Sequence, residues 1–386
     1  MNEFIIYNLG DVAKIFAGGD KPKLLSEFKT NECEIPVFAN GETKDGLQGY
    51  TDKAKVTEPA VTVSARGTIG YAVLRKEPFV PIVRLLTLIP NKKILDVYYL
   101  YYYLTLYRQK GIGSSQAQLI TPDLSKRTIS IPPLPTQKSI AKVLSDLDAK
   151  IELNNKINQE LEAMAKTLYD YWFVQFDFPD EEGKPYKSSG GKMVYNAELK
   201  REIPEGWEVK KLGDIIKKYA DKSTHIESKN ILNEGSYPVI TQDNGDLISG
   251  FTNENNPIED VPLIVFGDHS CTLRYIDFPF FRGADGTQIM YFEEDLTIYV
   301  YLFLQMIITQ IPGYGKYERH YKYLKEFNII IPKAKFLSEF QKIVEPIFNK
   351  ISKSRLQNQH LTTLRDWLLP MLMNGQVASR ASATAK

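Results

Sequence analysis

Cysteine is nearly absent from this chain, and its scarcity excludes two kinds of site. The 386 residues contain only Cys33 and Cys271, which lie far apart in the sequence. A disulfide framework needs several cysteines at regular spacings, and a structural zinc site needs ligand pairs such as CxxC or HExxH. Neither pattern occurs. We therefore expect no disulfide, no metal site and no cofactor.

Long apolar runs and an excess of positive charge are also missing. No stretch of about 18 apolar residues occurs, and residues 1–4 lack the basic and apolar start of a secretory signal. We therefore expect a cytoplasmic protein with no membrane partner. The 48 basic side chains nearly balance the 47 acidic ones. Because a stand-alone nucleic-acid binder usually has a clear positive excess, any binding to DNA should rely partly on charge supplied by partner proteins.

Signatures of catalysis are absent as well. Residues 187–192 lack the spacing of a phosphate-binding P-loop, and Gly111-Ile112-Gly113 does not complete a dinucleotide-binding fingerprint. No Asn-Pro-Pro-Tyr or Asp-Pro-Pro-Tyr turn, which would bind the target adenine of a methyltransferase, is found. These absences argue against methyl transfer by this chain itself.

What the chain does contain is a second copy of itself, displaced by about 200 residues. The segment LGDV at residues 9–12 returns as LGDI at 212–215, and the Ile-Pro pair at 131–132 returns at 331–332. Short runs of β-forming residues alternate with Gly, Pro and Asp clusters in each copy. The sequence therefore predicts two similar domains of the α+β class.

Each copy also contains one internal helix followed by a much longer one. Asp96 can cap a helix that ends near Tyr107, and its counterpart runs from Ile298 to Ile308. A long helical pattern follows each Ile-Pro pair. The predicted division is a first domain at 1–134, a first long helix at 135–176, a linker at 177–204, a second domain at 205–334, a second long helix at 335–378 and a disordered tail at 379–386.

Both long helices carry the heptad seam of a coiled coil. Asn154 and Asn158 interrupt the first seam near its middle, and Ser354 and Asn358 interrupt the second. Antiparallel pairing would bury both seams, place the domains at opposite ends and bring these polar residues together across a pseudo-two-fold axis. Alternatively, they point to solvent on a looser bundle. The predicted pairing residues are Leu144, Leu147, Ile151, Asn154, Asn158, Leu161, Leu168, Val344, Ile347, Ile351, Asn358, Leu361 and Leu368.

The length of these helices has a functional consequence. A helix of this length spans roughly 55 Å at about 1.5 Å per residue. Two similar domains held apart by such a spacer suit a linear target, and DNA with two short sequences separated by a fixed, unread gap fits this description. Pro346 is the one irregularity, because it should start the second helix near Glu345 or kink it.

Several segments resemble the specificity subunit of type I restriction-modification enzymes. They include IPPLPTQ at 131–137, DAKIELNN at 148–155 and IPEGWEV at 203–209, and the resemblance covers nearly the whole chain. It implies two target recognition domains separated by a long antiparallel two-helix coiled coil. Each domain would read one half of a bipartite site in double-stranded DNA. The first domain departs from the pattern because it lacks the Pro-Glu-Gly-Trp start of the second.

The resemblance also implies partners. Two modification (methyltransferase) subunits would dock on the helices, and restriction subunits would join in the full complex. Methylation and cleavage would belong to those subunits.

Base contacts cannot be carried over from the family, because its recognition domains vary widely. Glycine-rich loops before the last strand of each domain offer Gln and Arg for base edges and Ser, Lys and Tyr for phosphates. Loops around Arg66 and Arg274 form a second pair, for which a folding role is equally compatible. Arg84 and Arg282 are weaker phosphate candidates. The predicted DNA-binding residues are Arg66, Ser114, Ser115, Gln116, Gln118, His269, Arg274, Lys316, Tyr317, Arg319, His320 and Lys322.

Two other functions remain compatible with the sequence. The chain could be a methyltransferase or nuclease with cryptic active residues, in which case the isolated chain would bind S-adenosylmethionine. It could also be a coiled-coil scaffold that binds proteins, which its near-neutral charge favours. A DNA footprint with two protected half-sites would exclude the scaffold.

Overall fold

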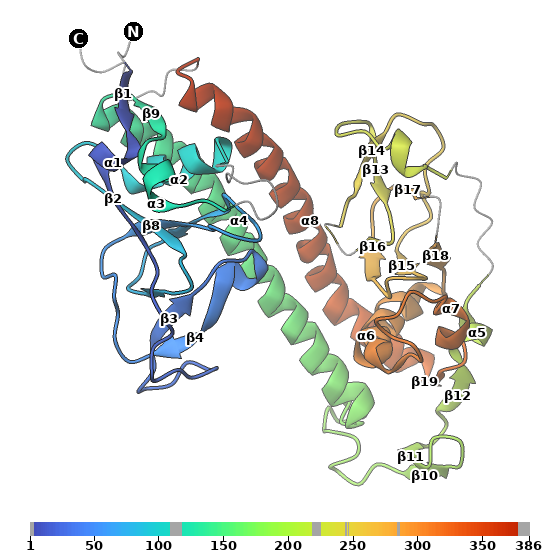
Figure 1. Cartoon of the computed structure of the whole chain (residues 1–386). Helices are drawn as coiled ribbons and strands as arrows, with labels where there is room; N and C mark the ends of the chain where they lie inside the picture. Colours follow the sequence, from blue (N-terminus) through green and yellow to red (C-terminus); the bar gives the residue numbers. More distant parts are fainter. Residues whose placement is uncertain are drawn as a thin grey trace. The chain divides into compact units, whose positions relative to one another are not determined.

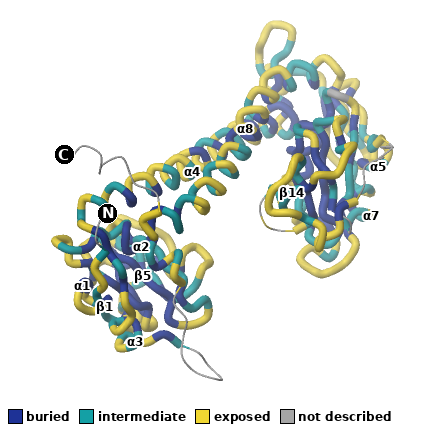
Figure 2. The backbone as a smooth tube through the Cα atoms, turned by 90° about the horizontal axis from the view of Figure 1, so that it is seen from above, coloured by how far each residue is buried: buried dark blue, intermediate teal, exposed yellow. Residues whose placement is uncertain are grey.

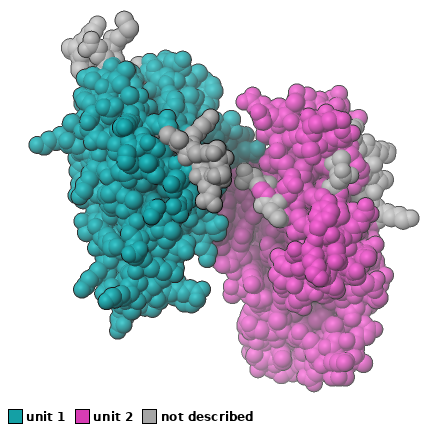
Figure 3. All heavy atoms as spheres, viewed as in Figure 1, with its two compact units in different colours: residues 1–153, 358–386 teal, residues 154–357 magenta. Residues whose placement is uncertain are grey.

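The structure is a computed structural model, and it describes residues 4–108, 118–217, 225–243, 245, 247–283 and 286–376. The chain divides into two units (Figure 3): residues 1–153 with 358–386, and residues 154–357. Each unit therefore contains one copy of the repeat and a part of both long helices. Ser114, Ser115, Gln116 and the predicted tail at 379–386 lie outside the described residues.

The first unit is built on a four-stranded sheet in the order β2-β8-β5-β6, of which β2 and β8 are labelled in Figure 1. A three-stranded sheet, β4-β3-β7, and the antiparallel pair β1-β9 accompany it. Strand β3 pairs with β7 in parallel, whereas the other pairs are antiparallel. The strands are β1 (Ile5–Asn8), β2 (Ala13–Ala17), β3 (Ile35–Phe38), β4 (Leu47–Thr51), β5 (Ala60–Val63), β6 (Ala72–Arg75), β7 (Val80–Pro81), β8 (Leu86–Pro90) and β9 (Thr128–Ile131).

The second unit repeats this topology. Its sheets β16-β15-β18, β14-β13-β17 and β12-β19 match β6-β5-β8, β4-β3-β7 and β1-β9 of the first, including the parallel pair β13 and β17. The internal repeat predicted from the sequence therefore extends to strand order. The strands are β12 (Glu208–Lys211), β13 (Tyr237–Ile240), β14 (Gly250–Thr252), β15 (Leu263–Gly267), β16 (Leu273–Ile276), β17 (Phe281–Arg282), β18 (Thr287–Met290) and β19 (Asn328–Ile331).

The internal helices, α2 (Val97–Leu106) and α6 (Thr297–Ile307), form where the sequence predicts them. The Asp96 side chain accepts hydrogen bonds from the backbone N–H groups of Tyr98 and Tyr99, a cap that contributes about 1 kcal/mol. Both helices pack against their sheets and belong to the main cores, which are the buried segments of Figure 2. The shorter helices are α1 (Leu9–Val12), α3 (Thr121–Ser125), α5 (Leu212–Ile215) and α7 (Tyr321–Leu324).

The long helices are α4 (Leu134–Tyr169), extended by a π-helical turn at Asp170–Val174, and α8 (Ala334–Met373). Within the first unit Arg365 forms an ion pair of 2.9 Å with Asp148, and Asn358 donates to the Ile151 carbonyl oxygen. These contacts run in opposite directions along the two helices, so the segments pack antiparallel. Asp148 also accepts a hydrogen bond of 2.6 Å from the Tyr102 hydroxyl, which ties α4 to α2. Burial, together with this hydrogen bond, raises the pKa of Tyr102.

Within the second unit the two helices pack in the same sense. The Asn154 amide donates to the Gln357 side chain at 2.9 Å, and Arg355 forms an ion pair with Glu162 at 2.6 Å. Contacts of Asn154 or Asn158 with Ser354 or Asn358 remain a prediction. Of the predicted pairing residues, Leu144, Asn154, Asn158, Val344 and Ile351 are buried, and Leu147, Ile151, Leu161, Leu168, Ile347, Asn358, Leu361 and Leu368 are half-buried.

The structure adds detail to two predictions about these connections. Helix α8 does not begin near Glu345, because it runs from Ala334 to Met373, and a kink at Pro346 remains a prediction. The predicted linker at 177–204 is mostly exposed, but it is also folded. It contains the hairpin β10 (Met193–Asn196) and β11 (Arg201–Pro204), and the Phe178 ring stacks on Tyr186 and Trp207. These aromatic rings anchor the segment to the core of the second unit.

Within the described ranges, no helix combines the length and apolar character that crossing a membrane requires.

Candidate functional site

A side-chain carboxamide braces the same loop in both copies of the repeat. In the first unit, Asn40 follows strand β3. Its oxygen accepts a hydrogen bond of 2.7 Å from the Ala65 N–H, and its amide donates to the Val83 carbonyl oxygen at 2.7 Å. In the second unit, Gln242 follows β13, and its oxygen accepts from the His269 N–H at 3.1 Å. In each copy, therefore, a carboxamide oxygen accepts a hydrogen bond from a backbone N–H of the loop that follows β5 or β15.

A backbone hydrogen bond joins each of these loops to a second one. The Leu119 N–H donates to the Ala65 carbonyl oxygen at 3.0 Å, and the His320 N–H donates to the Asp268 carbonyl oxygen at 2.9 Å. We call these segments the paired loops: residues 64–70 with 118–120 in the first unit, and 267–272 with 312–320 in the second. The predicted DNA-binding residues within the described ranges all lie on or next to them.

The paired loops of the first unit bring two predicted residues into contact. Arg66 donates to the side-chain oxygen of Gln118 from Nε at 3.2 Å and from Nη2 at 3.1 Å. Arg66 is exposed and Gln118 half-buried. A second arginine, Arg108, donates to the Ile69 carbonyl oxygen and forms an ion pair of 3.0 Å with Glu42, so its charge is already partly neutralised.

The paired loops of the second unit present aromatic and cationic groups. The rings of His269 and Tyr317 stack with centroids 4.5 Å apart and planes inclined by 9°. The His269 Nδ1 lies 3.1 Å from the Glu318 carbonyl oxygen, which holds the ring in place. Tyr317 is 85% exposed. Lys316, Arg319 and Lys322 are also exposed.

Two predicted DNA contacts need correction, because their side chains face inward. Arg274 is only 7% exposed on strand β16 and donates to the Asp243 carbonyl oxygen. His320 is fully buried, with Nδ1 at 3.0 Å from the Asp268 carbonyl oxygen and Nε2 at 3.0 Å from that of Gly313. Arg274 and His320 therefore hydrogen-bond within the protein and are not exposed to DNA.

Asn40 and Gln242 do not stand out in the sequence as functional residues. Their signal is weak but present, since each carboxamide stands a few residues after the Pro-Val pair that recurs in both copies. Of the phosphate candidates, Arg84 is exposed, whereas Arg282 is half-buried and contacts the Thr287 carbonyl oxygen at 3.5 Å.

Val83 and Arg84 adopt a backbone conformation that disfavours β-branched residues. Their φ angles are 50° and 60°, in the left-handed region, and the crowding of a β-branched side chain there costs about 1 to 2 kcal/mol. The chain is held in this conformation because Val83 donates to Gly19, Arg84 donates to Gly18 and Asn40 donates to Val83. The strained turn therefore lies beside the braced loop.

Val83→Gly is expected to raise the free energy of unfolding by about 1 kcal/mol, because glycine adopts positive φ without steric cost. The Val83 side chain is 54% exposed, so little packing is lost. Denaturant unfolding measures the change. Val83→Ala is the matched control, since it keeps a Cβ in the same conformation and should gain less. A glycine variant that is less stable than the wild type would contradict the strain.

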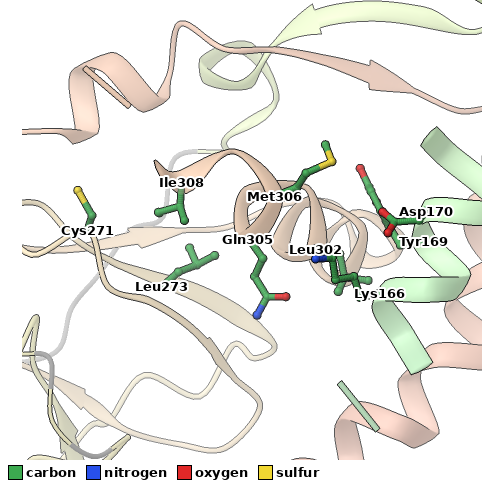
Figure 4. Close-up of a pocket in the computed structure, with 9 residues that line it drawn as sticks. All are labelled: Lys166, Tyr169, Asp170, Cys271, Leu273, Leu302, Gln305, Met306 and Ile308. Atoms are coloured by element: carbon green, nitrogen blue, oxygen red, sulfur yellow. The ribbon is translucent and has the colours of Figure 1, made fainter. Parts of the chain in front are cut away.

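The second unit also contains a hollow of about 400 Å³ (Figure 4). Its lining is largely apolar and includes Leu273, Leu302 and Met306, together with Lys166 of α4 and Asp170 of the turn that follows. Burial raises the pKa of the Cys271 thiol, which keeps this lining residue protonated. A protonated thiol is a weak nucleophile. Across the described ranges no cluster of three or more His, Cys, Asp or Glu side chains could hold a metal ion.

Comparison with known proteins identifies the family. The model of the type I restriction modification DNA specificity domain matches residues 1–163 and 204–364. The MjaIX specificity subunit of Methanocaldococcus jannaschii is 26% identical, over 92% of this chain and 81% of its own length. The HindI specificity subunit of Haemophilus influenzae is 24% identical, over 98% of this chain and 100% of its own.

A solved structure shares the fold. The S subunit of a type I restriction-modification system from M. genitalium superposes with a TM-score of 0.62 at 19% identity, over 96% of both chains. Because the family model matches well over half of the sequence, in one segment for each copy of the repeat, the chain belongs to the specificity (S) subunit family of type I restriction-modification enzymes.

Proposed function

We propose that the two domains read the two halves of a bipartite site in double-stranded DNA through their paired loops. The supporting observation is that one braced framework occurs twice with different outward side chains. Arg66 and Gln118 stand on the first copy, and His269, Tyr317 and Arg319 stand on the second. A common framework with different polar groups suits the reading of two different short sequences.

Helices α4 and α8 serve as the spacer between the half-sites in this proposal. A helix of 36 residues, the length of α4, spans about 54 Å at about 1.5 Å per residue. The pairs Asp148–Arg365 and Glu162–Arg355 favour one register of the antiparallel helices. A fixed register would give a fixed gap.

The same helices would dock two methyltransferase subunits, one on each unit. Val143 and Leu364 are exposed on the first unit, and Ile343 and Met164 are exposed on the second, each between 38% and 59%. These two apolar pairs occupy equivalent positions of the repeat, which supports two equal docking sites. This chain would then be non-catalytic, with methylation and cleavage carried out by the methyltransferase and restriction subunits.

Methylation mapping tests the proposal. DNA from cells that express the chain with its methyltransferase subunit should carry methyladenine in one motif of two short sequences separated by a constant gap. A continuous motif would contradict the bipartite reading. Binding of S-adenosylmethionine by the isolated chain would instead favour a catalytic role.

A further inference from the structure

We propose that Arg66 reads a guanine in the half-site of the first domain, and that Gln118 is a positioning residue that aims the arginine. The inference rests on the proposed reading of DNA by the paired loops. It specifies the base that is recognised, and it assigns different roles to Arg66 and Gln118, both of which could contact a base to judge from residue type alone.

The hydrogen bonds between the two side chains determine what each can still offer. A guanidinium group has five N–H donors. Gln118 accepts one from Nε and one from Nη2 of Arg66, along one edge of the group. Among the described residues no other group contacts the end of the guanidinium, so the N–H donors there on Nη1 and Nη2 can form two parallel hydrogen bonds. Guanine is the base whose major-groove edge presents two neighbouring acceptors, O6 and N7.

Gln118 no longer has both the free acceptor and the free donor that recognition of adenine requires. To recognise adenine, a glutamine accepts from N6 with its oxygen and donates to N7 with its amide. Here the oxygen already accepts two hydrogen bonds from Arg66. Outward, the pair offers only donors, so it selects an acceptor pair and disfavours bases that present a donor.

The backbone fixes the orientation of the pair. Arg66 directly follows Ala65 and Gln118 directly precedes Leu119, and Leu119 donates to the Ala65 carbonyl oxygen. Asn40 braces the Ala65 N–H from the other side. A fixed orientation of Arg66 is not needed for a phosphate contact, because a mobile positive charge binds phosphate equally well. A fixed orientation is needed for a directional, bidentate contact with a base.

The experiment uses the complex of this chain with its methyltransferase subunits and a duplex that carries the mapped site. Each guanine of the first half-site, on either strand, is replaced in turn by 7-deazaguanine, which lacks the N7 acceptor. One replacement should weaken binding by the wild-type complex about tenfold. Arg66→Ala should weaken binding to the unmodified duplex roughly 10- to 100-fold, and it should no longer respond to that replacement.

Gln118 is tested by rescue. Gln118→Ala should weaken binding and relax the preference for guanine at the same position, because the arginine is no longer aimed. Gln118→Glu keeps the acceptor oxygens and should retain the guanine preference. A residue that only stabilised the fold would lower affinity without changing base preference.

Three results would overturn the inference. They are a first half-site without guanine, an Arg66→Ala complex that binds as tightly as the wild type, and 7-deazaguanine sensitivity that persists in Arg66→Ala. Whether the site is bipartite is established separately by the wild-type methylation motif, so a failure of the proposed function can be told apart from a failure of this inference. The replacement series in wild-type protein also tests the guanine contact without any variant.

Discussion

Replacing Val143 and Leu364 together by aspartate is expected to remove one methyltransferase subunit from the complex and to leave the other bound. Both side chains are exposed on the helices of the first unit. Two carboxylates buried without partners in an apolar interface should weaken that docking site at least 100-fold. Native mass spectrometry of the assembled complex measures the loss as a change from two methyltransferase subunits to one.

The repeat provides the matched experiment. Met164→Asp with Ile343→Asp should remove the methyltransferase subunit of the second unit. Leu153→Asp is the control, because Leu153 is 51% exposed but its counterpart in the repeat is a lysine. Since all these positions face solvent, the free energy of unfolding should change by no more than about 0.5 kcal/mol. Retention of two subunits by both double variants would show that the subunits dock elsewhere.

The repeat, the internal helices and the long helices could be predicted because each depends on residue periodicity. The behaviour of Pro346 could not. A proline inside a helix costs about 3 kcal/mol, and the sequence alone shows nothing that offsets it. In the structure Phe340, Val344 and Phe348, in the turns of α8 before and after Pro346, are buried, whereas Pro346 itself is exposed. Burying each such side chain contributes about 1.5 to 3 kcal/mol, so packing keeps the helix continuous.

The folding of the segment 177–204 could not be predicted for a related reason. Its glycines, lysines and acidic residues have the composition of a linker, but one phenylalanine anchors it. Phe178 is buried, as is Phe176 just before the segment, and Phe178 and Trp207 stack with centroids 4.9 Å apart. Average composition does not reveal that a few aromatic residues have partners far along the chain.

At the candidate site, the sequence located the loops but not the direction of their side chains. Arg319 and His320 are neighbours of similar polarity, yet one is exposed and the other fully buried. The difference arises because the carbonyl oxygens of Asp268 and Gly313 surround the imidazole. Those partners are set by tertiary structure, since Asp268 lies on the other paired loop.

Substitutions of Arg319 and His320 can separate the effect of the loop on DNA binding from its effect on stability. His320→Ala is expected to lower the free energy of unfolding by about 2 to 4 kcal/mol, because it leaves a cavity and two buried carbonyl oxygens without their ring partner. The loop 312–320 would then lose its attachment, and binding to the second half-site should fall roughly 100-fold. Arg319→Ala should weaken the second half-site roughly 10-fold and leave the free energy of unfolding unchanged.

Binding to duplexes with one half-site scrambled measures both effects, and denaturant unfolding measures stability. For both variants the base preference at the first half-site should equal that of the wild type, because its paired loops lie in the other unit. Equal losses at both half-sites would contradict the assignment of one half-site to each domain. An Arg319→Ala protein as unstable as His320→Ala would instead mean that the arginine supports the loop, so that Tyr317 and the lysines would be left as its DNA contacts.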